Sequence, residues 1–208
     1  MQAMSSLPSL GRYFLPALLF LAVSARADTT TDATKAPAAV ENKAQAAVAA
    51  KSETTVDDAG RFVANFQGAV QRGSQQVPTK VGNIAMNMVY YDGGPVACMV
   101  IYCDYPAGSV ANSGGPDKVC QNASDGAVKS VNGTVRTSSP YQLGDLKGLE
   151  IVADIPPKDP TVPAGASVAR LRFFVVGERL YQVMYIGPTG TETSATAAAF
   201  FDSFRLMR

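Results

Sequence analysis

VARLRFFVV-GE-RLYQVMYI, residues 168–186, is the stretch on which the fold depends. Both runs are rich in β-branched and aromatic residues, which favour strands. Gly177 and Glu178 separate the runs, and glycine in the first of two turn positions is typical of a type II′ hairpin turn. The sequence therefore predicts an antiparallel hairpin in which Val175 lies opposite Leu180.

The predicted hairpin has two chemically different faces, because side chains alternate along a strand. One face is almost entirely apolar and carries Leu171, Phe173, Val175, Leu180, Gln182 and Met184. The other face mixes arginine with aromatic residues and carries Arg170, Arg172, Phe174, Tyr181, Val183 and Tyr185. A sheet with large apolar groups on both faces needs cover on both sides.

Two helices are expected to supply this cover. The first spans residues 116–131, begins with Pro116 and Asp117, and has a stripe of small side chains that suits close packing on a sheet. That stripe consists of Val119, Cys120, Ala123, Ala127 and Val131. The second helix spans residues 194–203. Its apolar face is expected to carry Ala197, Phe200 and Phe201, with Phe204 in the same spacing.

Strand patterns also occur in the part of the chain that precedes the hairpin. They cover residues 62–66, 71–79, 84–90, 96–105, 135–143 and 149–155. Turn signals lie at residues 92–94 and 144–148, and loops are expected at residues 108–115 and 156–165. The sequence thus predicts an α+β domain over residues 58–208, with an antiparallel sheet of about six strands flanked by helices.

The N-terminal region has the pattern of an export signal. Residues 13–23 form an apolar run of eleven residues behind Arg12, and Ala25-Arg-Ala27 matches an A-x-A cleavage site. A membrane span takes about 20 residues, so no stable membrane insertion is expected after cleavage. The sequence predicts a signal peptide at residues 1–27 and a periplasmic or extracellular protein. Residues 28–57, rich in alanine and threonine, are expected to be a flexible linker, with a tether across an envelope layer as the alternative.

Charge excludes one class of partner. The chain has 18 basic and 17 acidic residues, and its lysines and arginines do not cluster. Nucleic-acid-binding proteins place such residues together on one face or along one helix. We therefore expect no nucleic-acid partner.

The three cysteines allow at most one disulfide. Cys98 and Cys103 lie on one predicted strand, roughly 16 Å apart. A disulfide needs Cα atoms within about 7 Å, so these two cannot bond to each other. Cys120 lies on the stripe of the first helix and faces the sheet. A Cys103–Cys120 disulfide is one prediction, and buried free thiols are the alternative.

The chain lacks the residues of most catalytic sites. It has no histidine, no Cys-x-x-Cys, no P-loop and no G-x-G-x-x-G, so no catalytic residue, metal site or cofactor is expected. Glu150 and Asp154 share a strand face but lie roughly 13 Å apart. The carboxylates of a glycoside hydrolase are about 5–9.5 Å apart. Ion pairs with Arg170 and Arg172 are expected for these acids instead.

The arginine face of the hairpin is the candidate partner-binding site. It groups Arg170, Arg172, Phe174, Tyr181 and Tyr185, and arginine and tyrosine are enriched at interface hot spots. The alternative is that a helix or the 156–165 loop covers this face. If the face is open, charge reversal at Arg172 combined with Tyr181→Ala is expected to abolish partner capture and to leave the fold intact.

Several stretches together resemble a known family. They are Arg61-Phe-Val-Ala-Asn-Phe-Gln-Gly68, Tyr102-Cys-Asp-Tyr-Pro106, Asp117-Lys-Val-Cys-Gln-Asn-Ala-Ser-Asp-Gly-Ala127, Arg179-Leu-Tyr-Gln-Val183 and Phe200-Phe-Asp-Ser-Phe-Arg-Leu206. Behind a signal peptide, this pattern over about residues 60–206 resembles secreted bacterial proteins with a PsbP-like fold. The extrinsic photosystem II protein PsbP and the Ran-binding Mog proteins share that fold. The resemblance implies an α/β/α sandwich around an antiparallel sheet and carries over no catalytic residues.

Three functions remain open on the sequence alone. The preferred one is a non-catalytic binding or assembly protein with a protein partner in the cell envelope, because catalytic groups are missing. The second is a carboxylate- or metal-dependent hydrolase of the envelope. The third is a chaperone that shields apolar segments of an envelope partner.

Overall fold

The structure is a computed structural model that describes residues 52–79, 81–157 and 167–207. The predicted signal peptide and most of the predicted linker and 156–165 loop lie outside these residues. The described elements are β1 (Glu53–Asp57), β2 (Phe62–Phe66), β3 (Gln71–Thr79), β4 (Gly82–Asp92), β5 (Ala97–Asp104), α2 (Ser109–Asn112), α3 (Pro116–Ser130), β6 (Thr134–Leu143), β7 (Leu146–Ile155), β8 (Ser167–Val176), β9 (Arg179–Pro188), α4 (Ala195–Ser203) and β10 (Arg205–Leu206).

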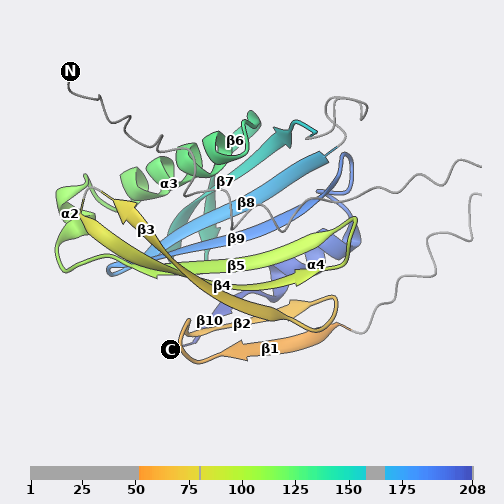
Figure 1. The fold of residues 1–208 in the computed structure, drawn as a ribbon, viewed down its shortest axis with the longest axis horizontal. Helices are drawn as coiled ribbons and strands as arrows, with labels where there is room; N and C mark the ends of the chain where they lie inside the picture. The colour runs from red at the N-terminus through yellow and green to blue at the C-terminus, as the bar shows by residue number, and fades with distance from the viewer. Residues whose placement is uncertain (1–51, 80, 158–166, 208) are drawn as a thin grey trace, which may run out of the picture.

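A seven-stranded sheet forms the centre of the molecule (Figure 1). Its order is β3-β4-β5-β9-β8-β7-β6, and every neighbouring pair is antiparallel. The predicted α+β class with an antiparallel sheet is confirmed, and the expected number of about six strands is corrected to seven. β1, β2 and β10 form a second, three-stranded sheet, so the predicted strand at residues 62–66 exists but does not belong to the main sheet.

The β8–β9 hairpin has the predicted register. Val175 lies opposite Leu180, and the pairing continues without a shift to Ser167 opposite Pro188. Gly177 has a φ of +59°, which the first position of a type II′ turn requires. β9 is the middle strand of the sheet, and every residue from Leu180 to Gly187 is buried.

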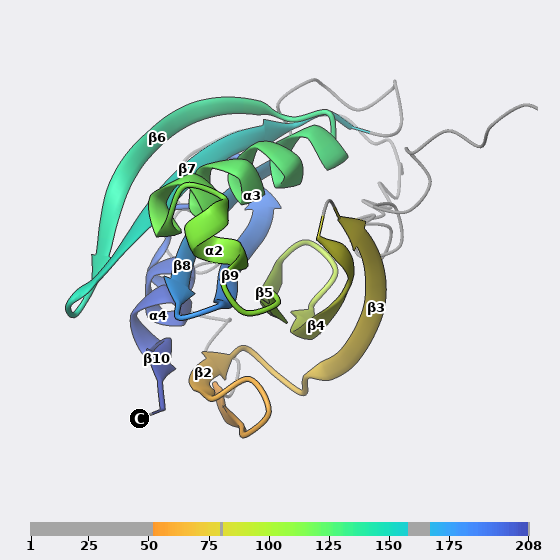
Figure 2. The same cartoon turned by 90° about the vertical axis from the view of Figure 1, so that its left-hand side faces the viewer.

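α3 covers the apolar face of the hairpin. Val119 and Cys120 of this helix are buried in one core cluster with Leu171, Phe173 and Met184. α3 packs on β7 and β8, and Figure 2 shows it on the opposite side of the sheet from β2. The predicted helix at residues 116–131 is thus confirmed over Pro116–Ser130.

α4 covers the other face of the sheet, together with β2. Phe200, Phe201 and Phe204 lie in a second core cluster with Phe174 and Tyr181 of the hairpin and with the inward side chains of β2. The helix begins as predicted at Ser194, whose side-chain oxygen accepts a hydrogen bond from the backbone N–H of Ala197 at 3.2 Å. The main sheet is therefore covered on both sides.

Besides β10, two short elements were not predicted. The end of the expected linker, Glu53–Asp57, forms β1 and pairs with β2. Its buried positions are Thr55 and Asp57, and polar residues do not produce the apolar alternation that indicates a strand. The loop expected at residues 108–115 contains α2, a single helical turn. Its first N–H groups are bound by a side chain distant in sequence: the Glu178 carboxylate accepts hydrogen bonds from Gly108 and Val110 at 2.8 and 2.9 Å.

Gly148 of β7 is held against the backbone and ring of its neighbour strand. A Cβ atom at this position would lie 2.5 Å from the Phe173 carbonyl oxygen and 2.6 Å from the Phe174 ring. The carbonyl belongs to the sheet and cannot move away without breaking the ladder. We expect Gly148→Ala to lower the free energy of unfolding by about 1–3 kcal/mol in urea titrations.

Gly126 of α3 provides the matched control for this prediction. A Cβ atom there has no neighbour within 4 Å, and its φ is not in the left-handed region. Gly126→Ala is expected to raise the free energy of unfolding by about 0.4–1 kcal/mol, since alanine restricts the unfolded chain and favours helix. Equal stability of the two variants would contradict the close contact at Gly148.

Candidate functional site

The arginine face of the hairpin is part of the core, which corrects the prediction of an open partner site. Four of its five residues are at most 6% exposed, namely Arg172, Phe174, Tyr181 and Tyr185, and Arg170 is half-buried. α4 and β2 cover these side chains. The alternative, that a helix covers the face, is the one the structure shows. The Tyr181→Ala and Arg172 double variant would remove core contacts and is not expected to leave the fold intact.

One carboxylate and two aromatic rings hold the buried arginines. Glu150 Oε2 lies 2.9 Å from Arg170 Nη2 and 2.6 Å from Arg172 Nε. The Arg172 guanidinium stacks over the Tyr141 ring at 3.9 Å and over the Phe201 ring at 4.6 Å. Cation–π contacts and charged hydrogen bonds together offset the cost of burying the two arginines.

Asp154 does not pair with these arginines as predicted. It binds Arg136, whose Nε donates to Asp154 Oδ2 at 2.8 Å and whose Nη1 lies 3.1 Å from Glu192 Oε1. Arg136 is the extra residue of a β-bulge, since the register of β6 against β7 shifts between Val135 and Thr137. A bulge redirects a side chain in a way that strict alternation does not anticipate.

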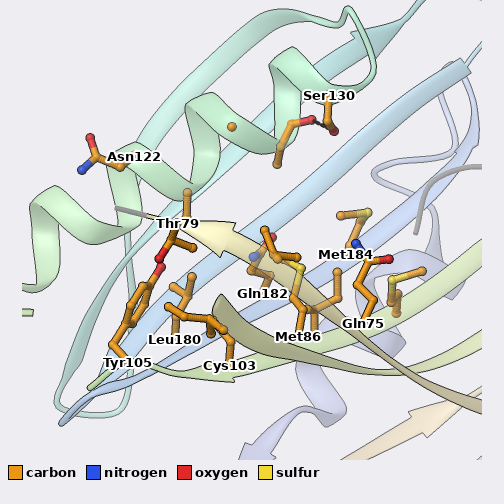
Figure 3. A pocket seen from close by; sticks show the side chains of 17 residues that line it. Gln75, Thr79, Met86, Cys103, Tyr105, Asn122, Ser130, Leu180, Gln182 and Met184 are labelled. Carbon is orange, nitrogen blue, oxygen red and sulfur yellow. Dashed lines mark hydrogen bonds between the residues drawn. The ribbon is translucent and has the colours of Figure 1, made fainter. Parts of the chain in front are cut away.

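An apolar pocket of about 210 Å³ lies on the other side of the sheet, between α3 and the half formed by β3, β4, β5 and β9 (Figure 3). Its walls are formed by Gln75, Val77, Thr79, Ile84, Met86, Met99, Ile101, Cys103, Tyr105, Asn122, Ala123, Gly126, Ala127, Ser130, Leu180, Gln182 and Met184. Thr79 and Asn122 are exposed and border the mouth, whereas Met99 and Met184 are buried.

The pocket exists because α3 sits over one half of the sheet. The helix packs on β7 and β8, so it leaves the β3–β5 half less covered. The helix residues that face this half are small: Ala123, Gly126 and Ala127. The small side chains of the helix were expected to allow close packing on the sheet. Over the β3–β5 half they leave the pocket between helix and sheet instead.

The sheet side of the pocket carries one deeply buried amide. Leu180, Gln182 and Met184 share a face of β9, and Gln182 is 5% exposed. Figure 3 shows Gln182 grouped with Met86 and Met184 on this side, with Asn122 and Ser130 across from them on α3. Sequence analysis placed Gln182 on the apolar face but did not assign it a role. A lone glutamine among apolar neighbours was the available signal.

All three cysteines are buried free thiols, so the structure does not contain the predicted Cys103–Cys120 disulfide. Burial raises the pKa of Cys98 to about 12. Burial also raises the pKa of Cys103 to about 11, with a further contribution from the charge of Asp104, and that of Cys120 to about 11, with a contribution from Asp117. These thiols therefore stay protonated and unreactive near neutral pH.

The described residues include few groups that could take part in catalysis. Among the described residues that line the pocket there is no carboxylate, lysine or arginine, and their one thiol, Cys103, is protonated. Across residues 52–79, 81–157 and 167–207, no three cysteines or acids lie together in a way that suits a metal ion. Among the helices that these ranges contain, none is long and apolar enough to cross a membrane.

Comparison with known proteins gives a likeness of structure alone. No family model and no curated protein matches the chain. The solution structure of cyanobacterial PsbP (CyanoP) from Synechocystis sp. PCC 6803 matches it with a TM-score of 0.51 at 10% identity, over 76% of this chain and 93% of that chain. The chain has a PsbP-like fold.

The PsbP-like fold agrees with the resemblance noted in the sequence, and it concerns architecture only. A crystal structure from Bacteroides thetaiotaomicron VPI-5482 also matches, with a TM-score of 0.46 at 9% identity, over 76% of this chain and 49% of that chain. At such low identity the side chains of a site are not transferred, so function has to be argued from the residues of this chain.

The buried ion pairs can be tested through Glu150. Glu150→Gln removes the counter-charge of Arg170 and Arg172, whose side chains are 17% and 7% exposed. We expect the free energy of unfolding to fall by about 3 kcal/mol, because two buried guanidinium groups lose their partner. Asp154→Asn changes a more exposed ion pair and is the control. It should lower the free energy of unfolding clearly less. Chemical denaturation followed by circular dichroism measures both, and equal losses would contradict the difference in burial.

The raised thiol pKa values predict slow labelling and a pH effect. At pH 8, the three thiols should react with a disulfide reagent only after unfolding in guanidinium. Because the thiol pKa values are higher in the folded state, stability should be retained below about pH 8.5 and decrease above it, where unfolded thiols ionise. A mass loss of two hydrogens relative to the reduced chain would reveal a disulfide and contradict this prediction.

Proposed function

We propose that this chain is a non-catalytic binding protein whose binding site is the apolar pocket between α3 and the β3–β4–β5–β9 half of the sheet. The pocket is the observation that carries the proposal. It joins a concave apolar wall with a few polar groups, which is the usual composition of a small-molecule site. Ligand burial there removes apolar surface from water, and that is the main favourable contribution to binding.

The hydrolase alternative has no support in the described residues. Glu150 and Asp154, the carboxylates that sequence analysis considered for it, are each bound to arginine. Each carboxylate is occupied by hydrogen bonds from a guanidinium group and is not free to contact a substrate. Both also lie on the α4 side of the sheet, away from the pocket.

The chaperone alternative is also less well supported than binding in the pocket. The large apolar side chains exposed among the described residues are four separate valines, Val56, Val81, Val135 and Val176. Shielding an unfolded segment needs a contiguous apolar surface, and such surfaces mark interaction sites when they exceed a few hundred Å². The apolar surface available for binding is concentrated in the pocket.

The proposal also includes where the protein acts and a protein partner. The pattern of residues 1–27 supports export, and we propose that the mature protein acts in the periplasm or outside the cell. A partner in the envelope is proposed on the absence of catalytic groups. Mass spectrometry of the secreted chain is expected to show an N-terminus at Asp28, and an intact Met1 would contradict export.

Two methionines of β4 give a direct test of the pocket. Met86 lines it, whereas Met88 lies on the same face of the same strand, is equally half-buried, and does not line it. We expect p-xylene to bind and to shift the methyl signals of Met86, Met99 and Met184 in NMR spectra. Met86→Gln should weaken that binding about tenfold, since a polar amide replaces an apolar wall.

Met88→Gln is the matched control and should bind p-xylene as the wild type does. Both variants must show wild-type circular dichroism, so that a loss of binding is not a loss of folding. Absence of p-xylene binding to the wild type, or equal weakening by both substitutions, would contradict the pocket as the binding site.

A further inference from the structure

We propose that the pocket binds a small neutral molecule that carries one hydroxyl or amide group on an apolar ring or short chain, and that Gln182 hydrogen-bonds that polar group. This inference rests on the proposed function and names its ligand class. The inference rests on one observation: Gln182, 5% exposed, lines the pocket among the apolar side chains of β4, β5 and β9, whereas the other polar residues of the sheet side, Gln75 and Thr79, lie on β3.

Gln182 lacks an internal hydrogen-bond partner for its side chain. Its backbone pairs within the ladder, opposite Ile101 of β5 and Phe173 of β8. No hydrogen bond joins its side-chain amide to another residue in the described part of the chain, and its amide atoms are not among the fully enclosed atoms that lack a partner, so they are open to the space of the pocket. A glutamine amide has two N–H donors and one carbonyl acceptor, so both kinds of hydrogen bond are available to a ligand.

The strand neighbours of Gln182 are apolar, so its amide is left to the contents of the pocket. Ile101 and Phe173 flank it on the two adjacent strands, and both are apolar and buried. Leu180 and Met184 flank it along its own strand. A ligand that fills the pocket and cannot hydrogen-bond this amide would leave it buried and unpaired, which is costly, so a ligand group that both accepts and donates is favoured.

The charge of the walls selects a neutral ligand. Among the described residues that line the pocket, none is lysine, arginine, aspartate or glutamate. A charged ligand would lose its hydration without gaining an ion pair, which is unfavourable at an apolar site. Hydroxyl and amide groups therefore fit this amide better than a carboxylate, a phosphate or an ammonium.

The volume sets the size of the ligand. An apolar cavity of about 150 Å³ holds benzene, so a pocket of about 210 Å³ accommodates a substituted ring or a short chain of roughly eight to ten heavy atoms. Met86, Met99 and Met184 provide flexible, polarizable walls that adapt to such a group. The polar group lies at Gln182, and the apolar part contacts these methionines.

Two probes of equal size separate the hydrogen bond from apolar burial. p-Cresol and p-xylene each have eight heavy atoms. They differ at one ring position, where p-cresol has a hydroxyl group and p-xylene has a methyl group. We expect Gln182→Met to change the ratio of the two dissociation constants about tenfold in favour of p-xylene, which is the effect of one lost hydrogen bond. Gln142→Met, the same substitution at an exposed glutamine of β6 that does not line the pocket, should leave the ratio unchanged.

The wild-type protein offers a second readout that needs no variant. The side-chain amide signal of Gln182 in ¹⁵N NMR spectra should shift with p-cresol far more than with p-xylene. A ratio that Gln182→Met leaves unchanged, or an amide signal that responds equally to both probes, overturns this inference while the proposed function stands. Failure of both probes to bind the wild type overturns the proposed function itself.

Discussion

Burial of the β8–β9 hairpin on both faces is the constraint on which the rest of the structure depends. β9 is the central strand of the main sheet, and its residues from Leu180 to Gly187 are buried. A strand of this kind is stable only if each face is covered by another layer. α3 supplies one layer, and α4 with the small β1–β2–β10 sheet supplies the other. The α4 side of the sheet holds the buried arginines, whereas the α3 side contains the pocket that we propose as the binding site.

On the α4 side, the buried arginines are paired within the protein. Arg170 and Arg172 share Glu150, and aromatic rings lie over their guanidinium groups. Such an arrangement has the residue types of an interface hot spot but serves as a core. On the α3 side, packing is incomplete, and the one buried amide, Gln182, is directed at empty space. Residue type alone therefore does not distinguish a binding surface from a core with buried charges.

The sequence predicted those parts of the fold that have a local periodic signal. The register of β8 against β9 followed from two turn residues, α3 followed from Pro116 and its apolar stripe, and α4 followed from the phenylalanine spacing. β1 was missed because its inward residues, Thr55 and Asp57, are polar. Arg136 was missed because a bulge displaces it from strict alternation.

The candidate site was beyond the reach of sequence patterns for a different reason. Which helix covers which face depends on the connections of the whole chain, and both faces of the hairpin carry large apolar groups. The volume left beside Gly126 depends on where α3 lies across the sheet, and small residues are compatible with close packing as well as with a gap. Gln182 was placed on the correct face, but its lack of a hydrogen-bond partner is a property of the assembled structure.

The three buried thiols connect the order of folding with oxidation. Cys98 and Cys103 lie on β5. One edge of this strand stays unpaired until β9, some 80 residues later in the chain, pairs with it. Until then both thiols are open to oxidants, and so is Cys120. In an oxidising compartment, folding and disulfide formation therefore compete in time. If the chain folds in such a compartment, slow β5–β9 pairing would lengthen the time during which these thiols can form non-native disulfides.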